Sequence, residues 1–515
     1  MKIKIIGGFV IILLLTVTFT VNAEILNNNF VESIENKKIS YDDDWSMFHH
    51  DLQNIGYSTS SAPNYRHILW KFKANQFVRS SPAVANGKIF IGSHGGMSIE
   101  DSHGKLYCLD AETGQKIWEY YNPWDYIFSS PAVAYGRVYF GSHDHFLYCI
   151  QESDGTKLWK FETEWWVYGS PTVLNEKVYF GAFKDIYCLD AITGELIWEY
   201  KTGGKIWSSP AIFNNRVYIG SHDEKLYCLN AVTGEVVWNK SIGTKYSSPA
   251  VVDGRVYIGT NSAKIYCLDA ETGDVIWNSD MASTDSSPAV AYGKVYIGGY
   301  THIYCFDAYN GGLIWRYDTF GKNIFSSPAV ADNKVYIGQN DDYLYCLDAN
   351  NGSLHWKYKT GWSIFSSPAV AYGKVYVGSE DGYVYAFVEP PSKPSDPPTI
   401  NGPIKGEKLK NYDYYFSSSD PEGSDVSFYV EWGDGTHSGW TNYVPSGQEI
   451  KISHTWIFDN VYQIKAKLKD NYNVESDWAT LEVTMSRNKA IKAPFFKLFH
   501  NHPHMFPILR ALLGL

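Results

Sequence analysis

The fold is decided by a stretch that begins Ser208-Ser-Pro-Ala-Ile-Phe-Asn-Asn-Arg-Val-Tyr-Ile-Gly220 and continues as Leu226-Tyr-Cys-Leu-Asn-Ala-Val-Thr-Gly-Glu-Val-Val-Trp238. Variants of it recur along the chain, with its proline at positions 82, 131, 171, 210, 249, 288, 328 and 368. Successive prolines lie 49, 40, 39, 39, 39, 40 and 40 residues apart. Each repeat predicts four short strands, which is the size of one β-propeller blade.

The predicted strands also favour a closed ring. They are apolar at consecutive positions, as in Leu226-Tyr-Cys-Leu229, whereas a sheet covered on one face alternates apolar and polar residues. A blade is covered on both faces by its neighbours. The sequence therefore predicts an all-β protein with an eight-bladed propeller over residues 44–388.

A tryptophan ends each repeat except the last. These residues are Trp118, Trp159, Trp198, Trp238, Trp277, Trp315 and Trp356. One more, Trp70, precedes the first Ser-Ser-Pro. We expect the strand around Trp70 to supply the missing fourth strand of the last blade, which joins the two ends of the ring and removes an open sheet edge.

The pattern Leu-Asp-Ala-x-Thr-Gly-x-x-x-Trp, as in Leu189 to Trp198, resembles the tryptophan-docking repeat of the PQQ-like (quinoprotein) propellers. The segment from Trp45 to Gly56 is similar to the start of such domains. The superfamily includes quinone-dependent alcohol dehydrogenases and non-enzymatic scaffolds, such as the propeller lipoprotein of bacterial outer-membrane assembly. The resemblance implies the fold, and the activity has to be argued from sites.

The N-terminus predicts export. Residues 1–23 are typical of a signal peptide, with Lys2 and Lys4 before an apolar run and Val21-Asn-Ala23 as a cleavage pattern. An uncleaved membrane anchor is the alternative. Residues 24–43 are expected to be a linker, and the protein is expected to be extracellular or cell-surface.

A second domain follows a proline-rich linker at 389–397. Within residues 398–485, Trp432-Gly-Asp-Gly-Thr436 and Ser453-His-Thr-Trp456 resemble the PKD domain, an immunoglobulin-like β-sandwich that serves as a spacer or adhesive element. Asn460 stands where that family usually has glycine. The acidic residues Asp420, Glu422 and Asp425 could hold Ca²⁺, although we favour a solvated acidic loop.

The tail, residues 486–515, is basic and amphipathic and too short in its apolar runs to span a bilayer. It could dock on the protein's own surface, contact a membrane peripherally or bind a partner. Similar tails follow PKD-like domains in archaeal exported proteins, so the resemblance implies an exported archaeal type.

The cysteines bear on the possibility of quinone chemistry. In PQQ enzymes the quinone stacks between a tryptophan and a disulfide of adjacent cysteines, beside Ca²⁺ and a catalytic Asp. The seven cysteines here are never adjacent and share one repeat position: Cys108, Cys149, Cys188, Cys228, Cys267, Cys305 and Cys346. Ala386 takes that position in the eighth repeat, which indicates a small buried slot. We therefore expect free thiols, no catalytic residue and no cofactor; PQQ with Ca²⁺ belongs to the oxidoreductase alternative.

Three histidines occupy one turn position, in the repeats of His94, His143 and His222. Together they could ligate zinc. The other repeats carry Phe183, Asn261, Tyr300, Asn340 and Glu380 there, so we interpret the turn as a variable surface position and expect no metal.

The residue before Ser-Ser-Pro varies and is mostly aromatic. It is Arg79, Phe128, Tyr168, Trp207, Tyr246, Asp285, Phe325 or Phe365. We name these eight residues the collar, because we expect them at the mouth of the central channel. They could bind a planar ligand, a sugar or a peptide, or simply form a hydrophobic plug, which we favour.

These patterns predict a non-enzymatic exported binding or scaffold protein whose propeller face engages a protein or glycan at the cell envelope. The alternative is a PQQ-dependent oxidoreductase. With a net charge of −11 and no run of Lys or Arg, the chain is not expected to bind nucleic acid.

Overall fold

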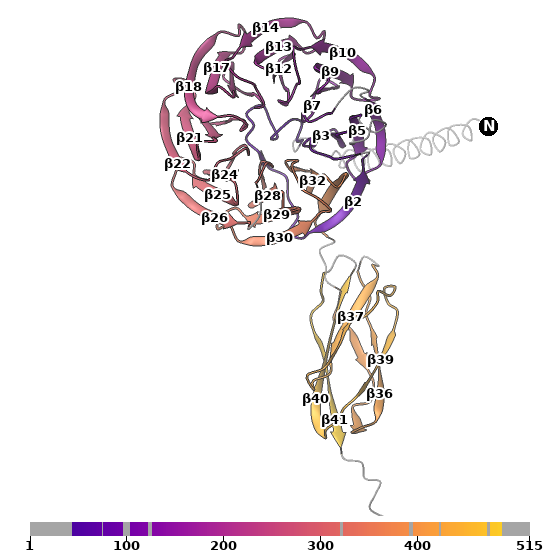
Figure 1. The fold of residues 1–515 in the computed structure, drawn as a ribbon. Coiled ribbons are helices and arrows are strands. Elements are labelled where there is room, and N and C mark those ends of the chain that lie inside the picture. The colour runs from indigo at the N-terminus through magenta and orange to yellow at the C-terminus, as the bar shows by residue number, and fades with distance from the viewer. Residues whose placement is uncertain are drawn as a thin grey trace, which may run out of the picture. The chain divides into compact units, whose positions relative to one another are not determined.

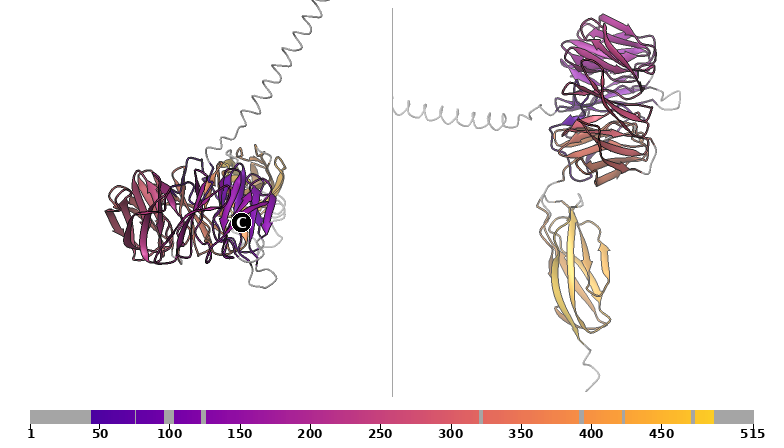
Figure 2. Two further views of the ribbon diagram at one scale, coloured as in Figure 1. Left: turned by 90° about the horizontal axis from the view of Figure 1, so that it is seen from above. Right: turned by 90° about the vertical axis from the view of Figure 1, so that its left-hand side faces the viewer.

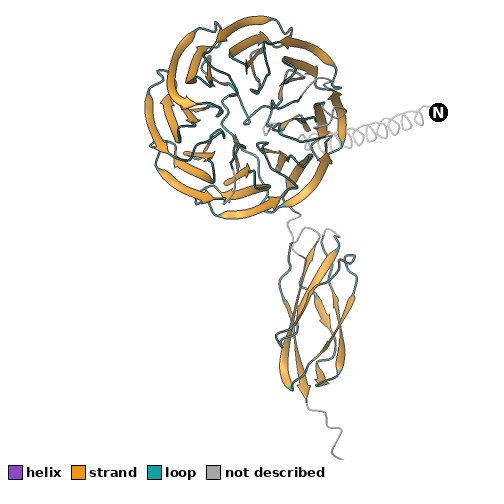
Figure 3. Ribbon diagram, in the orientation of Figure 1, coloured by secondary structure: helices purple, strands orange, loops and turns teal. Residues whose placement is uncertain are grey.

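The structure, a computed structural model, describes residues 44–74, 76–95, 103–121, 126–319, 323–390, 395–421, 424–470 and 474–486. Every regular element within them is a β-strand (Figure 3), which confirms the all-β prediction. The chain divides into two compact units, Met1–Val388 and Glu389–Leu515. The predicted signal peptide and linker (1–43) and the tail beyond residue 486 lie outside the described residues. None of the described residues forms a helix that could span a membrane.

The described part of the first unit forms eight sheets around one axis (Figures 1 and 2). Each sheet has four propeller strands, and we number the sheets as blades 1 to 8 in chain order. Leu226 to Leu229 are all fully buried in blade 4 or nearly so. The prediction that both faces of a blade are covered is therefore confirmed.

The innermost strands are β3 (Ala83–Ala85), β7 (Ala132–Ala134), β11 (Thr172–Leu174), β15 (Ala211–Phe213), β19 (Ala250–Val252), β23 (Ala289–Ala291), β27 (Ala329–Ala331) and β31 (Ala369–Ala371). The second strands are β4 (Lys88–Gly92), β8 (Arg137–Gly141), β12 (Lys177–Ala182), β16 (Arg216–Gly220), β20 (Arg255–Gly259), β24 (Lys294–Gly298), β28 (Lys334–Gly338) and β32 (Lys374–Gly378). The third strands are β5 (Lys105–Asp110), β9 (Phe146–Gln151), β13 (Asp185–Asp190), β17 (Glu224–Asn230), β21 (Lys264–Asp269), β25 (His302–Asp307), β29 (Tyr343–Asp348) and β33 (Tyr383–Val388). The outer strands are β6 (Lys116–Tyr121), β10 (Lys157–Glu162), β14 (Leu196–Lys201), β18 (Val236–Thr244), β22 (Val275–Asp280), β26 (Leu313–Asp318), β30 (Leu354–Lys359) and, in blade 8, β2 (His67–Lys73).

Strand β2 closes the ring as predicted. It pairs antiparallel with β33, with His67 opposite Val388 and Trp70 opposite Ala386. In blade 4 the same register places Trp238 opposite Cys228. Trp70 thus completes the blade whose repeat has alanine in place of cysteine.

Each tryptophan fastens its blade to the next one. Trp198 of blade 3 donates from Nε1 to the carbonyl of Ala231 in blade 4 at 3.1 Å. Its ring lies on Gly234, whose backbone has a φ of +75°; a Cβ there would come within 2.7 Å of the ring. Two features therefore require glycine at this position of the Thr-Gly turn: the left-handed backbone and the close approach of the indole.

Trp356 is an exception, because no glycine turn follows in blade 8 and its buried Nε1 has no hydrogen-bond partner among the described residues. Trp277 is equally buried but donates to the carbonyl of Ala308 at 3.1 Å. We expect Trp277→Phe to cost about 1 kcal/mol more unfolding free energy than Trp356→Phe, since only the former loses a hydrogen bond. Urea titration of the two variants measures the difference. Equal costs would contradict the assignment.

The serine that precedes the proline of each repeat, which is Ser170 of Gly169-Ser-Pro171 in blade 3, links the blades near the axis. The N–H of Ser81 donates to Oγ of Ser130 at 3.1 Å, and the same bond passes from blade to blade until the N–H of Ser367 donates to Oγ of Ser81 at 2.9 Å. The links between are Ser130–Ser170, Ser170–Ser209, Ser209–Ser248, Ser248–Ser287, Ser287–Ser327 and Ser327–Ser367. The repeated motif thus forms a closed circle of hydrogen bonds.

Residues 44–63, which we call the strap, cross the middle of the ring (Figure 1). Backbone carbonyls of the strap accept hydrogen bonds from the middle residue of innermost strands in blades 1, 2, 4, 5, 6 and 7, as in Val290 N–H to Ile55 at 2.8 Å. In blade 7 the strap forms a short parallel strand, β1 (Tyr57–Ser58), beside β27. The buried Asn54 adds side-chain bonds to the carbonyls of Pro210 and Pro249, both at 3.2 Å.

The second unit has two sheets packed over one core. One contains β34 (Thr399–Asn401), β36 (Asn411–Ser417) and β39 (Ile450–Thr455); the other contains β35 (Lys405–Glu407), β41 (Ala479–Ser486), β40 (Asn460–Asp470), β37 (Val426–Glu431) and β38 (His437–Trp440). Both sheets contribute to a core around Trp432 and Trp456. The unit is thus a β-sandwich, and its assignment as a PKD domain stays a prediction.

The acidic residues considered as Ca²⁺ ligands differ in burial and in hydrogen bonding. Asp420 is buried and accepts hydrogen bonds from Ser395 Oγ and from the N–H of Ser424. Asp425 is exposed, and Glu422 lies outside the described residues. Asp420 therefore serves the packing of the sandwich instead of belonging to a solvated loop.

Candidate functional site

The collar residues lie where each chain segment enters an innermost strand, directly before the serine pair or, in blade 3, before Gly169-Ser170. All eight side chains are half-buried. The strap and the turns that follow the innermost strands, such as Tyr372-Gly373, lie at the opposite end of these strands. The collar therefore surrounds the end of the ring axis that the strap leaves uncovered.

The aromatic members of the collar touch from blade to blade. Phe128 stacks on Tyr168 with ring centroids 5.3 Å apart, and Tyr168 stacks on Trp207 at 4.6 Å. Trp207 meets Tyr246 edge-on at 4.9 Å. Across the ring, Phe325 stacks on Phe365 at 4.9 Å. Edges and partial faces of these rings remain exposed because none of the side chains is buried.

Arg79 joins the two aromatic groups. Its guanidinium lies over Phe365 at 4.8 Å and over Phe128 at 5.4 Å. The buried carboxylate of Glu380 accepts from Arg79 Nε at 2.6 Å. The only cation of the collar is therefore neutralised by a turn residue, and the contact arc runs without a break from Phe325 through Arg79 to Tyr246.

Asp285 interrupts the arc. Its carboxylate accepts from Asn261 Nδ2 at 3.1 Å, and burial raises its pKa. A pocket of about 280 Å³ opens beside it, lined among others by Tyr246, Tyr300 and Asn323. The polar groups of the collar are thus paired within the protein, and the surface it presents is mainly aromatic.

The three turn histidines pack against collar residues: His94 and His143 both contact Phe128, and His222 contacts Trp207 and Tyr246. His143 lies 4.6 Å from Phe128, 4.5 Å from Tyr168 and 4.8 Å from Trp166, between ring centroids. It is only 5% exposed, and burial lowers its pKa to about 3. The prediction of a surface position is wrong for His143, because loops of the next blade cover the turn. Among the described residues, no cluster of three His, Cys, Asp or Glu side chains could hold a metal ion.

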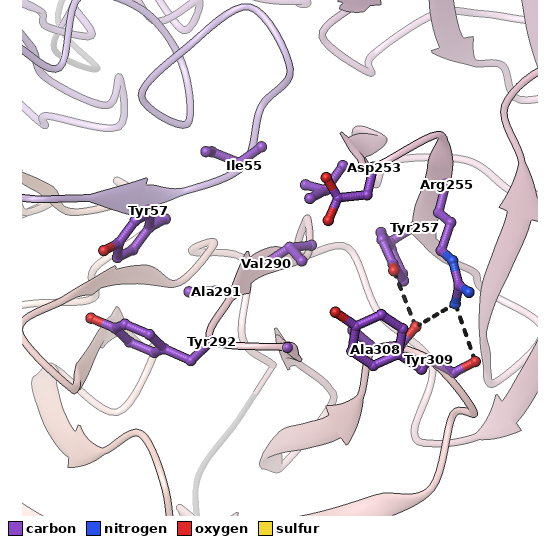
Figure 4. Close-up of a pocket in the computed structure, with 12 residues that line it drawn as sticks. Ile55, Tyr57, Asp253, Arg255, Tyr257, Val290, Ala291, Tyr292, Ala308 and Tyr309 are labelled. Atoms are coloured by element: carbon purple, nitrogen blue, oxygen red, sulfur yellow. Dashed lines mark hydrogen bonds between the residues drawn. The ribbon is translucent and has the colours of Figure 1, made fainter.

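A second pocket, of about 320 Å³, lies at the strap end of the ring between blades 5 and 6 (Figure 4). The repeat pattern did not predict it, because the strap supplies two of its residues, Ile55 and Tyr57. The sequence feature that could have indicated this pocket is the pair of aromatic turn residues Tyr292 and Tyr309, both of which are exposed.

Known proteins share the repeat sequence and the fold of this propeller. The family described as outer membrane protein assembly factor BamB (PQQ_2) matches residues 102–185, 178–300 and 299–389, together more than half of the chain. The chain belongs to the PQQ_2 family. Comparison with curated proteins finds no match.

Solved structures share the fold of this PQQ_2 propeller. BamB from Moraxella catarrhalis is 18% identical with a TM-score of 0.54, covering 62% of this chain and 97% of BamB. A europium-containing methanol dehydrogenase is 13% identical with a TM-score of 0.58, covering 68% and 98%. Quinohemoprotein alcohol dehydrogenase from Comamonas testosteroni is 16% identical with a TM-score of 0.56, covering 73% and 85%. These identities establish the fold alone.

The residues of this PQQ_2 propeller do not fit the quinone and calcium that the resemblance to quinoproteins implies. Its seven cysteines are free and buried on third strands of different blades, as the repeat position predicted. Burial raises the pKa of each thiol to about 11 or 12. The acids beside the collar, Asp285 and Glu380, are already engaged by Asn261 and Arg79.

Proposed function

We propose that this protein is a non-enzymatic binding or scaffold protein that holds an extended segment of a partner protein at the collar. The observation that carries the proposal is the contact arc of half-buried aromatic side chains around the end of the ring axis opposite the strap. Aromatic rings in such positions supply large contact areas at low conformational cost and are enriched at binding hot spots.

The chemistry of the collar favours a polypeptide over a sugar. The two charged members of the collar are already paired, Arg79 with Glu380 and Asp285 with Nδ2 of Asn261, so the surface that the collar offers to a partner is mainly aromatic. Prolines and aromatic side chains need only stacking surface. The similarity to an outer-membrane assembly factor supports the same class of partner.

Trp207→Ala tests the proposal. It removes the ring between Tyr168 and Tyr246, and we expect binding of aromatic- and proline-rich peptides from a peptide array to weaken by about tenfold or more, as for a hot-spot residue. Affinity is measured by fluorescence anisotropy with the full chain, and circular dichroism checks the fold.

Trp165→Ala is the matched control, since Trp165 is 42% exposed on the same face but contacts His145, Trp166 and Phe183 instead of the collar. Its peptide affinity should stay within about twofold of the parent value. Equal losses in both variants, or no peptide binding by the parent chain, would refute the collar as the binding site. Binding of glycans alone at the collar would assign it to the other partner class.

The dehydrogenase alternative makes a separate prediction. A quinone-dependent enzyme would show quinone absorbance and dye reduction after addition of PQQ and Ca²⁺. We propose that this chain shows neither, because the residues at the collar end do not supply the groups that would hold them.

We also propose that the protein is exported and acts at the cell envelope, with the β-sandwich as a spacer. The basic tail remains a candidate for peripheral membrane contact. Fractionation of the native cells tests the location, and recovery of the chain in the cytoplasm would contradict it.

A further inference from the structure

The pocket at the strap end, which we call the strap pocket, combines three elements. The strap contributes Tyr57, blade 5 contributes Asp253 and Arg255, and blade 6 contributes Tyr292 and Tyr309. Val252, Val290 and Ala291 provide its apolar lining. Figure 4 shows Tyr57 and Tyr292 on one side of Val290, and Asp253 and Tyr309 on the other. At about 320 Å³ it lies within the range of small-ligand sites, roughly 300–1,000 Å³.

The junction between blades 4 and 5 can be compared with the strap pocket, which lies between blades 5 and 6. Between blades 4 and 5, Arg216 donates to the carbonyls of Ala270 and Glu271 and pairs with the carboxylate of Glu271. That junction is closed by an ion pair. Because the repeats are built alike, it serves as an internal reference for the junction between blades 5 and 6.

At the strap pocket the carboxylate is replaced by a tyrosine. Arg255 makes the same two carbonyl bonds, to Ala308 at 3.3 Å and Tyr309 at 3.2 Å. Its guanidinium lies 5.2 Å from the centre of the Tyr309 ring and has no carboxylate partner among the described residues. Tyr309 is 61% exposed and Tyr292 is 41% exposed. The substitution leaves a cation and an aromatic face at an open junction.

The charges of the pocket select against charged ligands. Asp253 is exposed on a tight turn with a φ of +50°, and it belongs to no ion pair of the described residues. Its carboxylate disfavours an anion, while Arg255 disfavours a cation. A neutral hydroxyl group satisfies both, because it can donate to Asp253 and accept from Arg255. The apolar face of a sugar ring can also stack on an exposed tyrosine.

We propose that the strap pocket binds a neutral sugar unit of a glycan, stacked on Tyr309 and hydrogen-bonded by Asp253 and Arg255. This site is independent of the collar, since the two lie at opposite ends of the innermost strands. The protein would then engage a polypeptide at one end of the ring and a glycan at the other.

The experiment probes the full chain with an array of neutral, acidic and amino-sugar glycans, followed by calorimetric titration of the best neutral trisaccharide. We expect neutral glycans to be preferred, Tyr309→Ala to weaken binding by about tenfold or more, and Tyr309→Phe to stay within about threefold of the parent. Asp253→Ala should weaken binding by a similar factor to Tyr309→Ala, because it removes the acceptor for a sugar hydroxyl.

Tyr135→Ala is the matched control, because Tyr135 occupies the position of Tyr292 in blade 2, is 51% exposed and lies outside the pocket. It should leave affinity unchanged. Preference for acidic or amino-sugar glycans, absence of glycan binding, or affinity that survives both Tyr309→Ala and Asp253→Ala would overturn the proposal. Trp207→Ala should spare glycan binding and Tyr309→Ala should spare peptide binding, so the failure of one site is distinguishable from failure of the other.

Discussion

Trp70→Ala should destabilise the propeller by about 3–5 kcal/mol or more, the usual cost of truncating a packed tryptophan. Trp70 lies on Gly114 and donates from Nε1 to Ala111 at 3.2 Å, so it fastens the strand β2 of blade 8 to blade 1. Loss of the indole would weaken the junction between blades 8 and 1, which is the single junction at which the two ends of the propeller chain meet. Thermal unfolding measures the total effect, and hydrogen exchange shows where protection is lost.

Trp238→Ala provides the comparison. Trp238 is also half-buried, lies on Gly273 and donates to Ala270 at 3.1 Å, but its strand is continuous with the preceding strand of the same blade. We expect a local loss of protection at blades 4 and 5. Trp70→Ala should instead expose β2 and β33 together. Identical exchange patterns around the two sites would argue against the role of β2 as a closing strand.

Gly234→Ala should be far more harmful than a glycine-to-alanine change at a turn without a docked tryptophan. A left-handed backbone at a non-glycine residue costs roughly 1–2 kcal/mol. The added methyl would also lie 2.7 Å from the Trp198 ring, so the indole has to move and give up its bond to Ala231. We expect a total loss of about 3 kcal/mol or more of unfolding free energy, as for other overpacked cores.

Gly136→Ala separates the two causes. Gly136 has a φ of +67°, but a Cβ there meets nothing within 4 Å. Its substitution should cost only the backbone share, about 1–2 kcal/mol. Denaturant titrations of the two variants give the difference directly. If Gly136→Ala proves as costly as Gly234→Ala, the docked tryptophan is not the reason for the glycine.

Side-chain patterns made the ring and its closure predictable. Serine, cysteine, glycine and tryptophan recur because each makes the same contact in successive blades, and the exchange of Cys for Ala386 marks the blade completed by Trp70. The strap was recognisable only as a lead-in resembling the family. Its bonds come largely from backbone carbonyls, such as those of Ser46 and Gln53, and backbone groups leave no pattern in the side chains.

Only part of the candidate sites could likewise be predicted from the sequence. The collar could be located because its residues vary at a fixed repeat position. The burial of His143 could not be predicted, since Trp166 covers it from a loop further along the chain. The strap pocket needed the structure as well, because it joins Tyr57 to blades that lie some 200 residues later.

The strap also determines how the propeller would yield to mechanical tension. A pull applied at its first residues would load the hydrogen bond from Tyr372 to Asp44 and then the paired backbone hydrogen bonds between Trp45 and Val84. The backbone hydrogen bonds between the strap and the innermost strands of blades 2, 4, 5, 6 and 7 would then break one at a time, in that order, before the force reached β2. Such sequential peeling requires less force than breaking parallel bonds together. The strap would therefore lengthen gradually under load, while the sheets of the ring stayed intact.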